Sequence, residues 1–423
     1  MYAGLSLSSL LLLPFLVPTL AIIGRNAIHD QNLPELVWPK DQPIQYTFTA
    51  NFTDENKITV LQGLMGLEKK TCLTFKYVEQ DSMNSTVNGT QPILLYVNST
   101  TADHCYTTVG RNMSVAMQEI NLNTAHCDFR TYIHETLHVL GIYHTQNRYD
   151  RDEHITFYEN RTDPDWIPQH FKLSKNESKN YGVPYDFSSV MHYTPHEHID
   201  SGLPNFVAKD PLYQSAIGKN ILGAVHSDYL LVNRLYKCFD KCKGSGTVCQ
   251  NDGFVNPNDC QKCICPFAFG GAFCEELPDT TDVSNIVSSY KYATDKWTDA
   301  SLVTSDTAFE IWHIKASTGK HVEIEFLDVS PHANCGDSWP YLEVQLGNFL
   351  VGGYKFFCKA HLPKQVLISK GNLAVLTHVD FATGNDTTFT LRYRSVHVGK
   401  NGTNALSSIF VVLFSVMLWL VQE

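Results

Sequence analysis

Three histidines in the middle of the chain are spaced as ligands of a single metal ion. His134 and His138 are four positions apart, so on a helix both imidazoles project from one face. Gly141 follows one turn later, where a residue free to take positive φ can end the helix and let His144 approach. Three neutral imidazoles leave the fourth position of zinc open, as in catalytic sites. The spacing therefore predicts a zinc site.

Glu135 lies at the edge of the same helix face, directed toward the open position of the metal. Water bound there has a pKa of about 7, and a carboxylate can take its proton and pass it to a leaving amine. The short pattern from His134 to His138 occurs by chance in many helices. The longer pattern to His144, followed by Ser-Val-Met-His-Tyr at residues 189–193, is the metzincin signature. We therefore predict attack of water on a zinc-polarised peptide carbonyl.

The motif and its neighbourhood resemble the astacin branch of the metzincins. The resemblance is carried by residues 134–144, 148–152 and 184–193, and it extends over residues 25–238. It implies an α+β, two-lobed catalytic domain with zinc in the cleft. It also implies that Met191 forms a hydrophobic floor beneath the metal. The Tyr193 hydroxyl would be a displaceable zinc ligand that helps to hold the oxyanion. Other nearby histidines are off this spacing and are interpreted as non-ligands: His126, His192, His196 and His198.

Extended segments at residues 43–52, 72–78 and 92–97 and a leucine-rich helix at residues 58–69 are predicted before the histidine motif. Residues 109–111 and 117–120 resemble the family's edge strand. That strand would line the cleft and pair with an extended substrate backbone.

Two features depart from the astacin pattern. Thr145 stands where most astacins carry a glutamate, which anchors the new N-terminus after a propeptide is cut away. Arg25 follows the apolar leader directly, which leaves little room for a propeptide. We expect an enzyme without zymogen latency. A gene model that lacks its prodomain exon is the alternative.

Composition and cysteine content favour a secreted, modular protein. The chain has 423 residues, which is more than one domain usually contains, and its hydrophobic content of 43% is ample for a buried core. A net charge of −11 argues against nucleic-acid binding. The twelve cysteines and many glycosylation sequons suit an oxidising compartment. The sequons are at Asn51, Asn84, Asn88, Asn98, Asn112, Asn160, Asn176, Asn385 and Asn401.

The cysteines divide the chain into parts. The astacin resemblance implies the bridges Cys72–Cys238 and Cys105–Cys127. Six further cysteines are dense enough to indicate a small disulfide-stapled module, which resembles an EGF-like domain; a zinc ribbon is the alternative. Family connectivity there would be Cys242–Cys260, Cys249–Cys263 and Cys265–Cys274.

The C-terminal part alternates apolar and polar residues at 309–315 and 321–326, as half-buried strands do. With Cys335 and Cys358 it resembles a CUB domain, which is a β-sandwich; an unrelated sandwich is the alternative. The predicted parts are residues 25–238 (catalytic), 239–275 (EGF-like) and 285–397 (CUB-like).

Both ends of the chain carry apolar runs. Residues 1–21 are predicted to be a signal peptide, with an uncleaved membrane anchor as the alternative, which Pro14 and Pro18 disfavour. Residues 405–421 form a hydrophobic tail that is short for a helix crossing a core of ~30 Å. No basic residues follow the tail, so either a transmembrane helix or a lipid-anchor signal would tether the protein to a membrane.

Two functions from different classes follow. The first is a secreted or surface-tethered zinc endopeptidase of extracellular proteins, whose EGF-like and CUB-like modules dock other proteins. The second is an extracellular binding or adhesion protein on an impaired protease scaffold. Impaired relatives usually lose a ligand or the catalytic glutamate, and this chain keeps His134, Glu135, His138, His144 and Tyr193. The sequence therefore favours the endopeptidase.

Overall fold

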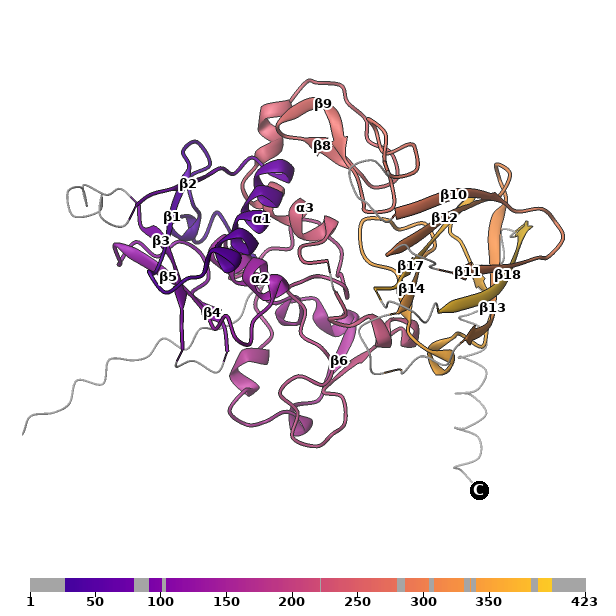
Figure 1. Ribbon diagram of the computed structural model, residues 1–423, viewed down its shortest axis with the longest axis horizontal. Helices are drawn as coiled ribbons and strands as arrows, with labels where there is room; N and C mark the ends of the chain where they lie inside the picture. Colours follow the sequence, from indigo (N-terminus) through magenta and orange to yellow (C-terminus); the bar gives the residue numbers. More distant parts are fainter. Residues whose placement is uncertain are drawn as a thin grey trace, which may run out of the picture.

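The computed structural model describes residues 27–79, 91–100, 104–220, 222–279, 286–303, 308–330, 335, 340–381 and 387–397. The chain has three parts: the N-terminal region (27–238), the cysteine-rich module (239–275) and the sandwich (286–396). Figure 1 shows the sandwich beside the N-terminal region and the cysteine-rich module at the top of the view. The predicted signal peptide and hydrophobic tail lie outside the described residues. Within the described ranges, no helix is long and apolar enough to span a membrane.

The N-terminal region contains a mixed sheet of strand order β2-β1-β3-β5-β4. The first four of these strands are parallel to their neighbours, and β4 pairs antiparallel with β5. The predicted extended segments correspond to β1, β2 and β3. The strand bounds are β1 Ile44–Phe48, β2 Phe75–Tyr77, β3 Ile93–Asn98, β4 Tyr106–Thr107 and β5 Met117–Leu122.

The edge of this sheet differs from the sequence prediction. Residues 117–120 belong to β5, which lies between β3 and β4, and residues 109–111 belong to no strand. The reason is Gly110, whose φ of 77° turns the chain away from the sheet. Its amide donates to the carbonyl of His138 (2.9 Å), and the amide of Arg111 donates to the carbonyl of Leu36 (2.7 Å). The strand at this edge of the sheet is therefore β4. Of the two predicted segments, residues 109–111 are bonded to the end of the helix that carries His138, and residues 117–120 lie inside the sheet.

Three α-helices are found in the described part of the chain: α1 (Asp54–Lys70), α2 (Phe129–Val139) and α3 (His226–Leu235). The predicted leucine-rich helix is α1, and it begins four residues earlier than predicted. Thr53 caps it by accepting a hydrogen bond from the amide of Asn56 (3.2 Å). A capped first turn thus extends the helix beyond its apolar repeat.

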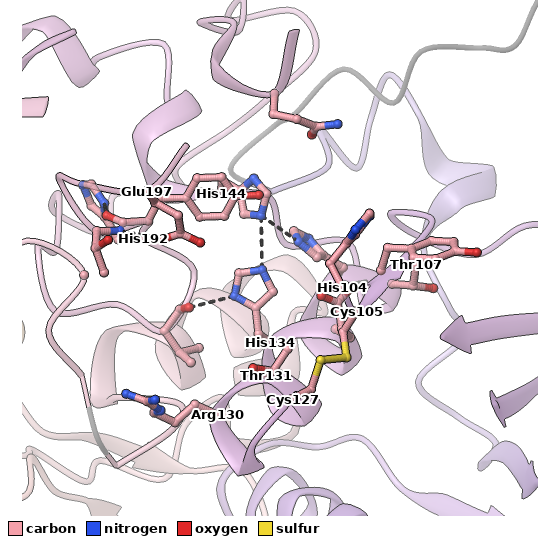
Figure 2. Close-up of a pocket in the computed structure, with 18 of the residues that line it drawn as sticks. His104, Cys105, Thr107, Cys127, Arg130, Thr131, His134, His144, His192 and Glu197 are labelled. Atoms are coloured by element: carbon pink, nitrogen blue, oxygen red, sulfur yellow. Dashed lines mark hydrogen bonds between the residues drawn. A yellow bond between two sulfur atoms is a disulfide. The ribbon is translucent and has the colours of Figure 1, made fainter. Parts of the chain in front are cut away.

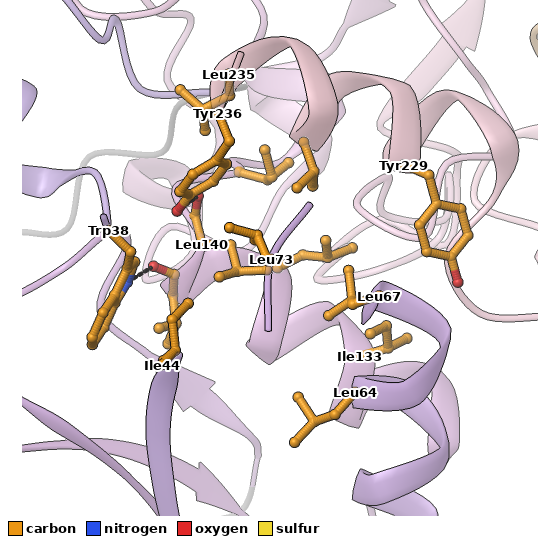
Figure 3. Packing of buried hydrophobic residues seen from close by; sticks show 14 of the residues in the cluster. Trp38, Ile44, Leu64, Leu67, Leu73, Ile133, Leu140, Tyr229, Leu235 and Tyr236 are labelled. Carbon is orange, nitrogen blue, oxygen red and sulfur yellow. Dashed lines mark hydrogen bonds between the residues drawn. The ribbon is translucent and has the colours of Figure 1, made fainter. Parts of the chain in front are cut away.

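Helix α2 is held by a hydrophobic core that lies between α1, α3 and the sheet (Figure 3). Leu64 and Leu67 of α1 and Ile133 of α2 are buried there. The Trp38 indole donates to the carbonyl of Val139 at the end of α2 (2.9 Å). This bond satisfies one of the carbonyls that a helix end leaves without a partner in the helix.

The chain beyond α2 folds into short 3-10 turns, a two-stranded sheet of β6 (Ile155–Phe157) with β7 (Phe206–Ala208), and α3. Phe206 is buried in a second small cluster with Tyr185 and Phe187. This part provides the other side of the cleft.

Disulfides join the cysteines in the pairs that the resemblance implied. Cys72–Cys238 and Cys105–Cys127 lie in the N-terminal region. The cysteine-rich module pairs β8 (Phe254–Asn256) with β9 (Asp259–Ile264) and contains Cys242–Cys260, Cys249–Cys263 and Cys265–Cys274. Cys335–Cys358 lies in the sandwich.

The C-terminal part is a β-sandwich, as predicted. One sheet has the order β10-β12-β17-β14-β15 and the other β11-β18-β13-β16. Apolar side chains such as Ile314, Ile324 and Leu376 fill the space between them. The strands are β10 Ile286–Tyr292, β11 Thr298–Val303, β12 Phe309–Lys315, β13 His321–Ser330, β14 Tyr341–Gln345, β15 Tyr354–Phe356, β16 Leu367–Ile368, β17 Leu373–Val379 and β18 Thr388–Val396.

Candidate metal centre and cleft

The three predicted ligands converge on one point. The Nε2 atom of His144 lies 3.1 Å from that of His134 and 3.0 Å from that of His138. The Nδ1 atoms of His134 and His138 face backbone carbonyls, of Val190 at 2.8 Å and of Ile142 at 2.7 Å. Figure 2 shows the rings of His134 and His144 joined by one of these contacts. Because Nδ1 must carry the proton to donate to a carbonyl, each Nε2 is left with a free lone pair facing the common point.

The protonation of these rings suits a metal. Burial lowers the pKa of His134 to about 4, and burial followed by repulsion from neighbouring histidines holds the pKa of His138 and His144 well below the usual range. Metal ligands must be neutral imidazoles, so the rings are in the binding form at neutral pH.

The donor set fits zinc. His134, His138 and His144 each offer a nitrogen within 4.8 Å of the others, and they form a zinc-binding triad. None of the four histidines interpreted as non-ligands belongs to this group in the described part of the chain. His192, for example, uses its ring nitrogens on the hydroxyl of Tyr185 (2.8 Å) and its neighbour's carbonyl (2.7 Å).

Local sequence explains how α2 presents the ligands. Asp128 caps its start by accepting from the amide of Thr131 (3.2 Å). At the other end Gly141 takes a φ of 91°, and its amide donates to the carbonyl of His138 (2.8 Å). The left-handed residue predicted from the sequence therefore turns the chain so that His144 faces the ligands on the helix.

Glu135 lies beside the triad and is 5% exposed. Its Oε2 atom is buried and has no hydrogen-bond partner among the described residues. Burial raises the pKa of this carboxyl to about 8. A proton acceptor that is poised near neutral pH and faces a cleft is suited to general acid–base chemistry.

The segment that contains Met191 is bonded to the chain that carries the ligands. Met191 is fully buried, and its carbonyl accepts from the amide of Thr145, directly after the third ligand (2.8 Å). Asp228 at the start of α3 accepts from the Ser189 hydroxyl (2.6 Å) and the Val190 amide (3.2 Å). The sequence analysis missed this role of Asp228, because no local pattern links α3 to residues 189–191.

Tyr193 packs against the third ligand. Its ring centroid lies 4.3 Å from that of His144, and burial holds the pKa of its hydroxyl well above the usual range. The hydroxyl is therefore a hydrogen-bond donor at neutral pH. Its role as a ligand, and that of Met191 as a floor, remain predictions.

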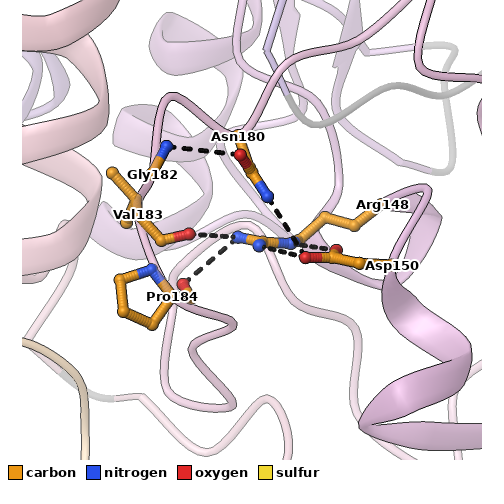
Figure 4. A network of polar contacts seen from close by, with 6 residues as sticks. All are labelled: Arg148, Asp150, Asn180, Gly182, Val183 and Pro184. Atoms are coloured by element: carbon orange, nitrogen blue, oxygen red, sulfur yellow. Dashed lines mark hydrogen bonds and ion pairs between the residues drawn. The ribbon is translucent and has the colours of Figure 1, made fainter.

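A buried ion pair braces the chain after His144. Arg148 bonds both oxygens of Asp150 (2.7 Å each) and donates to the carbonyls of Val183 (3.0 Å) and Pro184 (3.1 Å), as Figure 4 shows. A bidentate guanidinium–carboxylate pair has a defined geometry. It joins the ligand segment to the chain that leads to residues 189–193.

The cleft has a volume of about 510 Å³, and its walls come from separate parts of the chain. β4 contributes Tyr106 and Thr107 on one side, as expected for an edge strand. His198, interpreted from the sequence as a non-ligand, lines another wall together with its neighbour Glu197. Further wall residues carry no signal in the local sequence, because they belong to segments outside the motif: Trp166, Gly218 and Asn220.

Comparison with known proteins places the site in context. The family model for the Astacin peptidase family matches residues 30–237. Zinc metalloproteinase nas-27 of Caenorhabditis elegans is 29% identical over 378 residues, which cover 84% of each chain. Zinc metalloproteinase nas-28 of the same organism is 30% identical over 383 residues, which cover 87% of this chain and 73% of the relative. A solved structure of high choriolytic enzyme 1, a hatching enzyme zinc-protease from Oryzias latipes, matches with 23% identity and a TM-score of 0.42, covering 51% of this chain and 98% of its own.

Proposed function

Because this chain belongs to the astacin family of zinc metalloproteases, we propose that it hydrolyses peptide bonds of extracellular proteins by general-base catalysis from Glu135. The observation that carries the proposal is the juxtaposition of the converging Nε2 atoms with a buried carboxylate oxygen that has no protein partner in the described residues. Leaving such an oxygen unpaired costs stability, and a substrate water would satisfy it.

His134, His138 and His144 would hold a zinc ion, which would supply Lewis-acid chemistry by polarising the peptide carbonyl and lowering the pKa of a bound water. Glu135 takes a proton from the attacking water and returns it to the nitrogen of the leaving amine. Burial raises the pKa of Glu135, which makes its carboxylate a stronger base toward the water and lets its protonated form serve as the acid toward the amine.

Tyr193 donates its hydroxyl hydrogen to the oxyanion that develops on the attacked carbonyl. The hydroxyl stays protonated because burial raises its pKa and because the negative charges of Glu197 and Glu135 disfavour a phenolate nearby. The contact of its ring with His144 keeps this donor beside the metal site.

Secretion is part of the proposal. The disulfides in all three parts of the chain require an oxidising compartment. The sequons at Asn51, Asn160 and Asn176 lie at exposed positions, as glycosylation needs, and those at Asn98 and Asn112 are half-buried. Asn84, Asn88, Asn385 and Asn401 lie outside the described residues. The tail would tether the protein to a membrane, and the cysteine-rich module and sandwich would dock other proteins.

The test is cleavage of a quenched casein substrate by the chain purified from the medium of expressing cells. We expect activity that a chelator abolishes and zinc restores. Glu135→Gln should lower kcat by about 10²–10⁴-fold while one zinc per chain is retained. Glu153→Gln, at an exposed position, is the matched control and should keep full activity.

A zinc-loaded wild-type chain that cleaves none of several protein substrates would overturn the proposal. It would favour the binding protein on an impaired scaffold. Equal activity of wild type and Glu135→Gln would instead show that the protein is a peptidase in which Glu135 is not the general base.

A further inference from the structure

The cleft wall made by Gly218 and Asn220 belongs to a segment, residues 210–220, that lies between the cleft and the sandwich. On the cleft side, the Gly218 amide donates to the carbonyl of Phe187 (2.8 Å). A Cβ on Gly218, whose φ is 64°, would lie 2.7 Å from the carbonyl of Tyr193. The segment is therefore in direct contact with the chain that carries Tyr193.

On its other side, the segment is bonded to strand β15 of the sandwich. The Lys355 ammonium donates to the carbonyl of Lys219, and the Ser215 hydroxyl donates to the carbonyl of Lys355 (2.5 Å). The Tyr354 hydroxyl donates to the carboxylate of Asp210 (3.0 Å). Residues at the beginning, middle and end of the segment are thus each held by the same short strand.

Lys355 is an unusual residue for such a contact, because it is only 3% exposed. Burial lowers its pKa, and the carboxylates of Glu343 and Asp186 oppose that effect. Burying an ammonium is costly unless charges and hydrogen bonds compensate it. Its bond to the Lys219 carbonyl, between the two wall residues, therefore fixes the backbone of the wall.

A second contact holds the sandwich against the segment that leads to Met191. The Gly352 amide donates to the buried Asp186 carboxylate (3.1 Å), which also accepts from the Ser188 amide (2.8 Å) and the Ser227 hydroxyl (2.6 Å). A Cβ on Gly352 would lie 2.4 Å from the Cβ of Ser188, so any larger residue would force Ser188 to shift. The sandwich is thus bonded on both sides of the wall.

We propose that Lys355 is a positioning residue for the cleft wall at Gly218 and Asn220, so that the sandwich helps to determine which substrate side chains the cleft accepts. The inference rests on the proposed function, because it concerns how the same cleft binds peptides. Gly218 and Asn220 line the cleft, whereas Glu135 and the histidine ligands belong to other segments, so displacement of the wall should change peptide binding more than the chemical step.

The test compares full-length wild type with Lys355→Met, which keeps the aliphatic stem and removes the donor. Kinetics are measured on a peptide library that varies each position around the cut. We expect KM to rise about tenfold for the preferred peptides and the ranking of side chains to change at one position. Zinc content and kcat should stay within about twofold of the wild type.

Two further variants keep the test decisive. Lys320→Met is the matched control, because this lysine lies in the same sandwich and bonds Asp295 there; it should leave KM and the ranking unchanged. Ser215→Ala removes the partner contact from the other side and should change the same position in the ranking, in case Lys355→Met does not fold.

An unchanged KM and ranking in both Lys355→Met and Ser215→Ala would overturn the inference. So would a fall in the active fraction with normal KM, since that is the result expected of a residue that serves stability alone. An inactive wild type would instead count against the proposed function, so the two failures are distinguishable.

Discussion

The cleft and the contact between residues 210–220 and the sandwich both bury ionisable side chains, but they satisfy them differently. In the cleft, Oε2 of Glu135 has no partner among the described residues, and the nitrogens of the triad face one another. At the sandwich contact, Asp186 accepts three hydrogen bonds and Lys355 donates to a carbonyl. An unsatisfied buried polar atom costs stability, and beside three converging imidazoles a bound ligand can remove that cost. Buried charges whose hydrogen bonds are all made within the protein hold parts of the fold together instead.

Burial alone does not mark a site, as two histidines show. His138 in the cleft and His378 in the sandwich are both buried, and burial lowers the pKa of both. His378 packs against Phe389 (5.0 Å between ring centroids), and neither ring nitrogen has a partner in the described residues. His138 differs because its Nε2 meets a second imidazole and its Nδ1 has a carbonyl. Convergence of donors therefore distinguishes the metal site.

The largest effect is expected when one of the three converging nitrogens is removed. His138→Asn should reduce bound zinc from one per chain to nearly none and abolish peptidase activity, because two imidazoles hold zinc weakly. Zinc is quantified by elemental analysis of the dialysed protein. His126→Asn, an exposed non-ligand that lines the same cleft, is the control and should keep its zinc. Retained zinc in His138→Asn would show that the ligand set is wrong.

Tyr193→Phe sharpens the assignment of the oxyanion donor. We expect kcat to fall by about 10²-fold, the effect of losing one preorganised donor, with KM and zinc content little changed. Steady-state kinetics with zinc quantification measure this. A variant whose kcat is within about twofold of the wild type would remove Tyr193 from the chemistry.

The buried carboxyl of Asp228, which is bonded to residues 189–190, should make the free energy of unfolding depend on pH. Burial raises its pKa to about 7, so between about pH 4 and pH 7 the folded chain keeps a proton that the unfolded chain has released. Its contribution to the free energy of unfolding is fully present below the ordinary pKa of 3.8 and is lost as pH rises through about 7.

Asp228→Asn cannot ionise, so its stability relative to wild type should improve by about 3 kcal/mol between about pH 4.5 and pH 8. Urea unfolding of both proteins at several pH values measures this difference. Asp165→Asn, at an exposed position, should show no such trend. The same pH dependence in wild type and Asp228→Asn would refute the raised pKa.

The smallest effect is expected in the sandwich. Replacing His378 by leucine removes two buried nitrogens without partners in the described residues, so it should raise the free energy of unfolding by about 1 kcal/mol. Peptidase activity should stay unchanged. Urea unfolding measures the change, and clear destabilisation would show that the ring nitrogens are satisfied in solution.

Much of the site was predictable because it is local. The helical spacing of His134 and His138 and the left-handed Gly141 act within one turn of each other, and the structure agrees with each. Strands β12 and β13 were predicted for the same reason, since alternation of apolar residues is a local property. The edge strand was predicted at the wrong residues, because β4 is only two residues long and the turn at Gly110 depends on a bond to His138, although Val109 of the predicted segment does line the cleft.

The sequence alone determined the three zinc-binding histidines, the position of Glu135 beside them and strands of the sandwich such as β12 and β13, because each depends on residues whose spacing matches a helix turn or a strand repeat. The tertiary structure decided what surrounds them. Asp228 beneath residues 189–191, the wall at Gly218 and Asn220, and Lys355 behind that wall come from distant parts of the chain. No short pattern connects such residues, since their contacts exist only after the sheets and helices have packed together.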